Sequence, residues 1–230
     1  MIVLRPANER GHANFGWLDS HHTFSFGNYY DPRHMGVSVL RVINEDRVAA
    51  GGGFAPHSHQ NMEILSYVLD GALEHKDSMG TSSVIRPGEV QLMSAGTGVT
   101  HSEYNAQRDK PVHFLQIWLL PAVKGVAPRY QQKSFAEDND KLRLVVSPDG
   151  AEGSLELHQD ARIYRVRLNP GEALEQALPA GRTYYFHAAR GAGTLNERGL
   201  VAGDGVTLFE ESTLTLGTTE GLEGLLFDLP

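Results

Sequence analysis

The chain has 230 residues and a formal net charge of −8, and it contains no cysteine. The acidic balance argues against a general nucleic-acid binder, because that role depends on basic patches that release counterions from phosphates. The absence of cysteine excludes disulfides, thiolate metal ligands and a cysteine nucleophile. At this length the chain can form one large β domain or two small ones.

The first residues carry no signal-peptide pattern, and no apolar run approaches the roughly 20 residues that a membrane-spanning helix requires. We therefore expect a cytoplasmic protein that does not insert into a membrane.

Short runs rich in valine, isoleucine, leucine and aromatic residues follow one another along the first half of the chain. They cover residues 37–42, 62–69, 90–93 and 112–120. Turn signals such as Asp70-Gly71 and Pro87-Gly88 separate them. Helical periodicity is weak throughout, so the pattern predicts an all-β barrel or sandwich.

Two pairs of metal-ligating side chains lie among these runs, His57 with His59 and His101 with Glu103. Each pair has i, i+2 spacing, so both members project to the same side of a strand. Two such strands facing each other would bring three imidazoles and one carboxylate to a common point. This donor set suits iron(II) with vacant coordination positions, and it would also accept manganese, nickel, cobalt, copper or zinc.

A second carboxylate competes for the same role. If one strand runs on from His57, a period of two places Glu63 on the face of His57 and His59, and one face of a small barrel lines its interior. The i, i+2 spacing from His101 favours Glu103 as the ligand. Glu63 would then accept a ring N–H from a ligand histidine, or be a buried carboxylate paired with an arginine.

The remaining histidines of the first half are expected to be structural. His21 and His22 are adjacent, so on a strand they face opposite sides and cannot both bind one ion. The others are interpreted as hydrogen-bonded side chains, namely His12, His34, His75 and His113.

A second, fainter copy of the strand pattern follows a polar connection at residues 137–141. Its expected strands cover residues 142–146, 163–168 and 183–188. The last of these leads into Gly191 much as the strand at 62–69 leads into Gly71. An internal duplication of this kind predicts two barrels in one chain, which we assign to residues 1–133 and 134–230.

The second copy lacks counterparts of the histidine pair. Matching Gly71 with Gly191 gives an offset of 120 (191 − 71), which places Ala177 and Pro179 at the positions of His57 and His59. Nine of the eleven histidines lie in residues 1–113. We therefore expect any metal site in the first barrel only.

The two histidine segments resemble the metal-binding motifs of the cupin superfamily. The first motif has a glycine, five residues, H-x-H, then a glutamate and a glycine; its counterparts here are Gly51, His57, His59, Glu63 and Gly71. The second has P-x-G, two residues, a histidine, three residues and an asparagine. Gly98, His101 and Asn105 fit this second motif, whereas Gly96 stands where proline is usual.

Three longer runs resemble the pirin family, specifically its short bacterial members with quercetin dioxygenase activity. The runs are residues 17–26 (WLDSHHTFSF), 57–63 (HSHQNME) and 93–103 (MSAGTGVTHSE). The resemblance implies a bicupin, with a metal-binding first barrel and a second barrel without ligands. It also implies that Glu103, rather than Glu63, completes the ligand set with His57, His59 and His101.

The same resemblance implies an activity. A metal-dependent dioxygenase of this type cleaves a flavonol such as quercetin with O2 and releases carbon monoxide, with Glu103 as the base that takes the hydroxyl proton. We further expect a monomer without direct nucleic-acid binding. The alternatives are a non-catalytic, iron-dependent redox sensor or transcriptional co-regulator of the pirin type, and an isomerase or dioxygenase acting on another small molecule.

Overall fold

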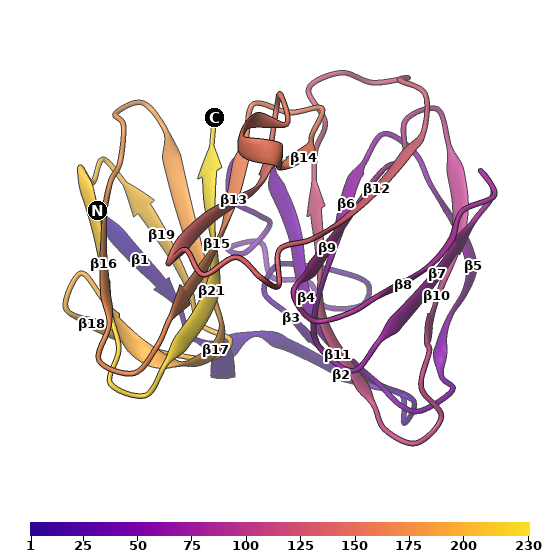
Figure 1. Cartoon of the computed structure of the whole chain (residues 1–230), viewed down its shortest axis with the longest axis horizontal. Coiled ribbons are helices and arrows are strands. Elements are labelled where there is room, and N and C mark those ends of the chain that lie inside the picture. The colour runs from indigo at the N-terminus through magenta and orange to yellow at the C-terminus, as the bar shows by residue number, and fades with distance from the viewer. The chain divides into compact units, whose positions relative to one another are not determined.

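The computed structural model describes all 230 residues, and they form two compact units (Figure 1). One unit, here the metal-site barrel, comprises Gly11–Glu137 with Leu157–Gln159; the other, the second barrel, comprises Met1–Arg10, Asp138–Glu156 and Asp160–Pro230. The only helical segments are two 3-10 turns, Ala7–Glu9 and Ala151–Gly153. The predicted all-β class is therefore confirmed. None of the helical segments has the length and apolarity that a membrane crossing demands.

The metal-site barrel is built from two sheets. Its strands are β2 Gly11–Asn14, β3 Leu18–His22, β4 Leu40–Val48, β5 Gly53–His59, β6 Glu63–Asp70, β7 Leu73–Asp77, β8 Ser82–Ile85, β9 Glu89–Ser94, β10 Val99–Asn105, β11 Val112–Leu119 and β12 Arg129–Ser134. A 7-stranded sheet has the order β12-β9-β6-β11-β4-β3-β2, and a 4-stranded sheet has the order β5-β10-β7-β8. Apolar side chains of both sheets meet in the interior, for example Val68 and Phe114 with Leu73 and Ile85.

The apolar runs mark the central strands of the larger sheet. The runs expected at 62–69, 90–93 and 112–120 are β6, β9 and β11, which are hydrogen-bonded neighbours. The run expected at 37–42 is displaced, because β4 covers Leu40–Val48. The second half of β4 was missed since Asn44 and Asp46 interrupt the apolar pattern, although both are buried.

The expectation of one continuous strand from His57 past Glu63 is wrong. The chain turns at Asn61, whose φ is +50°, and the Asn61 N–H donates to the carbonyl of Gly96 at 2.9 Å. β5 and β6 consequently lie in different sheets. His59 and Glu63 therefore cannot be placed on one face by counting residues.

The second barrel repeats this plan. Its strands are β1 Ile2–Arg5, β13 Leu142–Ser147, β14 Leu155–Glu156, β15 Arg162–Leu168, β16 Ala173–Ala177, β17 Thr183–Leu195, β18 Arg198–Val201, β19 Gly205–Phe209, β20 Thr213–Gly217 and β21 Leu222–Leu229. The order β19-β17-β21-β15 corresponds to β9-β6-β11-β4, and the pair β16-β20 corresponds to β5-β10. The expected duplication is confirmed, and the chain is a bicupin.

The first residues belong to the second barrel, because β1 pairs with β19, Leu4 opposite Val206. The units are thus not two consecutive stretches of chain. Because the units are made of non-consecutive stretches, they do not test a single boundary along the chain. The boundary expected between residues 133 and 134 therefore stays a prediction.

The inner face of the β16-β20 pair carries apolar side chains where the β5-β10 pair carries its histidines. His57 lies opposite His101 in the β5-β10 pair, and Leu174 lies opposite Leu216 in the β16-β20 pair. Leu174, Leu214 and Leu216 pack in the core of the second barrel, whereas Glu175, Ala177 and Thr215 are exposed. An offset of 120 does not carry over to β16, because residues 178–182 connect β16 to β17 whereas residues 60–62 connect β5 to β6.

Candidate metal centre

Three imidazoles converge where β5 and β10 run side by side. His57 and His59 lie on β5, and His101 lies directly opposite His57 on β10. The ring centroids are 4.5 Å apart for His57 and His101, and 4.9 Å apart for the two pairs that contain His59. One ligand atom from each ring lies within 4.8 Å of the other two. The cluster predicted from the H-x-H spacing is therefore formed by the fold.

Two glycines allow the strands and loops around the cluster to approach closely. A Cβ atom at Gly53 would lie 2.5 Å from the carbonyl oxygen of Glu103 and 2.6 Å from the Cα of Tyr104. At Gly96, φ is +49° and a Cβ atom would lie 2.1 Å from the carbonyl oxygen of Val126. Proline cannot adopt a positive φ, which explains why glycine stands at the motif position where proline is usual.

The nitrogens of the cluster are arranged for a cation. The Nδ1–H of His57 donates to the carbonyl of Ala55 at 2.8 Å, because a carbonyl can only accept. The Nε2 lone pair of His57 is therefore available. The Nε2 atoms of His59 and His101 are buried without a hydrogen-bond partner. Buried polar nitrogens normally have partners, so the three residues fit a metal ion.

A buried series of hydrogen bonds reaches the Nδ1 atom of His101. The Nε2–H of His75 donates to Asp77 Oδ2 at 2.9 Å, and His75 Nδ1 lies 3.4 Å from His101 Nδ1. With the His75 proton on Nε2, Nδ1 can only accept, so the Nδ1–H of His101 donates to it. His101 then keeps its Nε2 lone pair free. The Asp77–His75 pair thereby selects the tautomer of His101 that can bind a metal.

Burial favours the neutral form of two rings of the cluster, His59 and His101. It lowers the pKa of His59 to about 4 and that of His101 to about 3, and in both cases the charge of His57 acts in the same direction. A metal binds imidazole only in its neutral form. These two rings therefore need not lose a proton near pH 7 before an ion binds.

Glu103 lies beside the cluster and is held by its own partners. It is on β10 two residues after His101, past an irregularity in the β5 pairing, and its carboxylate is not part of the group within 4.8 Å. The Ser66 hydroxyl donates to its Oε1 at 3.2 Å and the Gln116 amide to its Oε2 at 2.8 Å. Burial raises the pKa of Glu103 to about 7, and the charge of Asp46 adds to this rise.

Glu63 is buried elsewhere on β6. It accepts a hydrogen bond from the Ser94 hydroxyl at 2.9 Å, and burial raises its pKa to about 7 against the effects of Ser94, the His158 backbone and Arg129. None of these partners is a cluster histidine. Two roles were expected for Glu63: a partner of a ligand imidazole, or a buried carboxylate near an arginine. Its position fits the second role better.

A cavity of about 1180 Å³ opens onto His57, His59 and Glu103. Its walls are largely aromatic: Phe15, Trp17, Phe26, Tyr29, Phe54 and Trp118. The Trp118 ring meets the His59 ring edge to face, with centroids 4.9 Å apart. Polar side chains also line the cavity, among them His12, Asn14, Ser20, His22, Asn44, Asp46 and Gln116. Most of the wall thus suits a flat apolar molecule, and the polar side chains suit its hydroxyl groups.

The sequence pattern does not indicate several of these residues. His75 is expected to be only a structural histidine, although His75-x-Asp77 has the same i, i+2 spacing as the ligand pairs. No residue spacing in the sequence relates Asp46 and Gln116 to Glu103, because pairing across three strands places them near it. His21 and His22 do face opposite sides of β3, as expected, since only His22 of the pair is buried.

Two barrels of this topology, with an imidazole cluster in one of them, define a bicupin with a candidate metal centre. Residues 3–119 match the family model described as Pirin, and residues 144–229 match that described as Quercetinase C-terminal cupin domain. The chain belongs to the pirin family.

Relatives at high identity cover the whole chain. Quercetin 2,3-dioxygenase of Escherichia coli (strain K12) is 49% identical over 230 residues, which is 100% of this chain and 99% of that protein. The crystal structure of YhhW from Escherichia coli superposes with a TM-score of 0.96 at 48% identity, covering 100% of this chain and 98% of that one. A structure of bacterial pirin YhhW in complex with nickel(II) gives 0.95 at 48% identity, covering 100% and 99%.

Proposed function

We propose that the chain is a metal-dependent dioxygenase that cleaves a flavonol such as quercetin with O2 and releases carbon monoxide. The observation that carries the proposal is the convergence of three imidazoles beside one buried carboxylic acid, with His57, His59 and Glu103 lining an aromatic cavity. The relatives named as quercetin 2,3-dioxygenases support this reading over a non-catalytic redox sensor.

The aromatic walls would bind and orient the substrate. Trp17 and Phe54 meet edge to face with centroids 5.3 Å apart, and Phe26 meets Trp118 in the same way at 5.3 Å. Planar rings of a flavonol can stack or make edge contacts with such side chains. Closing apolar groups around the substrate also keeps bulk water from the reacting carbon atoms.

His57, His59 and His101 would hold the metal, and Glu103 would join them or act beside them. When bound, the ion supplies Lewis-acid and redox chemistry for the reaction of the flavonol with O2. Glu103 takes the proton of the flavonol hydroxyl on a carboxylate oxygen. Its raised pKa, near 7, suits a group that accepts and later returns a proton near neutral pH. Ser66 and Gln116 orient the carboxylate for this transfer.

Iron(II) is the metal that we propose, because mixed imidazole and carboxylate ligation with vacant positions suits it. The nickel(II) complex of the Escherichia coli pirin supports a divalent first-row metal in this family. A monomeric state, a cytoplasmic location and the absence of nucleic-acid binding also belong to the proposal.

The test is turnover of quercetin by protein loaded with iron(II). We expect loss of flavonol absorbance with uptake of O2 and release of carbon monoxide, and no turnover by His59→Ala. The control is His113→Ala, a histidine that does not line the cavity and whose Nε2–H donates to Glu45 at 2.9 Å. Equal rates for His59→Ala and the unaltered chain would overturn the proposal.

A further inference from the structure

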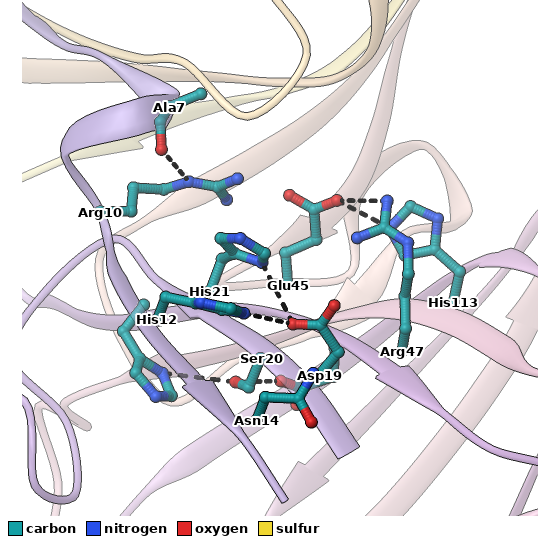
Figure 2. Close-up of polar contacts among 12 residues, drawn as sticks. Ala7, Arg10, His12, Asn14, Asp19, Ser20, His21, Glu45, Arg47 and His113 are labelled. Carbon is teal, nitrogen blue, oxygen red and sulfur yellow. Dashed lines mark hydrogen bonds and ion pairs between the residues drawn. The ribbon is translucent and has the colours of Figure 1, made fainter. Parts of the chain in front are cut away.

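We propose that His12, Asp19 and His21 form a second site for a divalent first-row metal ion, distinct from the cluster of His57, His59 and His101. The three residues come from β2 and β3, two neighbouring strands that end the larger sheet of the metal-site barrel. Figure 2 shows the two imidazoles and the carboxylate turned toward one another. One ligand atom from each of the three lies within 4.8 Å of the other two.

Strand pairing explains why the three side chains meet. His12 lies directly opposite His21 in the antiparallel pair, and their rings stack with centroids 4.5 Å apart and an interplanar angle of 20°. Asp19 precedes His21 by two residues and so leaves the same face of β3. Its Oδ1 lies 2.7 Å from His12 Nε2 and 3.9 Å from His21 Nδ1. The paired backbone therefore fixes the three groups together.

This face of β3 is the one turned away from the cavity. Ser20 and His22, which alternate with Asp19 and His21, are buried and make hydrogen bonds with Asp46 and Asn44. The side chains of His12, Asp19 and His21 keep 52%, 40% and 30% of their surface exposed. An ion from solvent can therefore reach Asp19 and His21 without entering the substrate cavity, whereas His12 also lines that cavity.

The neighbouring charges permit a cation. Arg47 lies opposite Asp19 on β4, but its guanidinium donates to Glu45 at 3.0 Å, and the Nε2–H of His113 donates to the same oxygen of Glu45 at 2.9 Å (Figure 2). Glu45 thus balances Arg47, and the carboxylate of Asp19 faces the two imidazoles. Two nitrogens and one carboxylate oxygen select zinc, nickel, cobalt or iron over calcium or magnesium.

An ion at this position would tie β2 to β3. Both strands also contribute to the cavity wall, through Ala13 and Asn14 on β2 and Ser20 on β3. Since β2 is the edge strand of its sheet, only its pairing with β3 fastens it there. A cross-strand metal link would therefore stabilise this part of the cavity wall.

The experiment measures, by equilibrium dialysis, the number of Zn²⁺ ions that bind to each full-length chain. We expect two ions on the unaltered chain, one on His21→Ala, and one on the double variant His57→Ala/His59→Ala. His113→Ala is the matched control and should keep two ions, because His113 pairs with a carboxylate on the same sheet but belongs to no group of three ligands.

A second measurement assigns the ligands. In the His57→Ala/His59→Ala variant, added Ni²⁺ should broaden the imidazole NMR signals of His12 and His21 before those of His113. An unchanged number of bound ions in His12→Ala/His21→Ala would overturn the proposal. If the His57→Ala/His59→Ala variant fails to fold, the comparison of His21→Ala with the unaltered chain still decides. Flavonol turnover is not a readout here, so this outcome is independent of the proposed activity.

Discussion

The nitrogen that each imidazole presents to the candidate metal centre is decided by the group on its other nitrogen. For His57 that group is the Ala55 carbonyl, and for His101 it is the chain that runs through His75 to Asp77. Hydrogen bonds from His75, Thr81 and Met79 lower the pKa of Asp77, although its burial acts in the opposite direction. Asp77 is therefore ionised and accepts at both oxygens.

Asp77→Asn should weaken metal binding at the candidate centre by about 10–100-fold, the usual effect of losing a partner of a ligand histidine. The asparagine oxygen can still accept from the N–H groups of Met79 and Thr81, which bond Asp77 Oδ1. Its amide nitrogen would instead donate to His75 Nε2 and reverse the tautomers of His75 and His101.

The measurement is the affinity for Ni²⁺ by calorimetry, with Asp109→Asn, an exposed carboxylate, as the control. An unchanged affinity in a folded Asp77→Asn protein would show that this chain of hydrogen bonds does not orient His101.

Asp46 should make the metal-free protein less stable as the pH rises. Burial raises the pKa of Asp46 from 3.8 to about 7, opposed by the Ser20 hydrogen bond and reinforced by Glu45. The folded state therefore holds the proton more tightly than the unfolded chain. The stabilisation is complete below about pH 4 and is lost as the pH rises to about 7, by up to about 4 kcal/mol.

Asp46→Asn should flatten this decline in the free energy of unfolding. Urea unfolding between pH 4 and 8 measures it, and the comparison with the unaltered chain removes the contributions that Glu63 and Glu103 make in the same direction. Parallel curves for the two proteins would contradict the assignment.

Regular residue spacing predicted the histidine cluster, but it did not indicate the side chains that reach the cluster and Glu103 through pairing between strands. The H-x-H and His-x-Glu patterns identified His57, His59 and His101 because a strand has a period of two. Asp46 and Gln116 reach Glu103 only through the registers of β4, β11 and β6, which residue spacing does not encode. The relation between His75 and His101 likewise depends on the pairing of β7 with β10.

At the level of elements, the candidate centre depends on how closely β5 approaches β10. Gly53→Ala should push these strands apart, because the added Cβ would meet backbone atoms of Glu103 and Tyr104 as well as the Tyr104 ring. We expect a loss of about 1–3 kcal/mol in stability, as for other overpacked sites, together with weaker metal binding.

Gly199→Ala is the matched control, since a Cβ atom there meets nothing within 4 Å. Thermal unfolding and Ni²⁺ titration of the two variants provide the measurement. A Gly53→Ala protein as stable as Gly199→Ala would mean that the strands can separate without cost.

Strand prediction succeeded where burial on both faces makes a strand apolar throughout. β6 is such a strand, with Ile64, Leu65, Tyr67 and Val68 all buried between β9 and β11. The bend between β5 and β6 was missed because only the positive φ of Asn61 creates it. Asparagine tolerates this conformation, but nothing in the local apolar pattern required it.

At the scale of the whole molecule, the first strand is part of the second barrel. Removal of residues 1–6 should destabilise that barrel, because β1 pairs with β19 over Ile2 to Arg5 and Ile2 packs against its core. Amide hydrogen exchange of β19 measures the effect, and we expect faster exchange at Val206 and Leu208. The amides of β6 serve as the internal control; equal protection of β19 with and without the segment would contradict the prediction.

The duplicated plan was predictable from the turn glycines. Gly88 and Gly203 both adopt a positive φ in corresponding turns, at +86° and +90°. The residues that face the interior from β16 and β20 were not predictable from an offset of 120, because the connection from β16 to β17 is two residues longer than its counterpart.

Leu174, Leu214 and Leu216 cover the inner face of the β16-β20 pair, the face on which the other barrel carries its imidazoles. The molecule therefore contains a second copy of the scaffold with an apolar inner face. Histidines grafted at these three positions would show whether strand geometry alone captures an ion, or whether buried supports such as Asp77 and His75 must be transplanted as well.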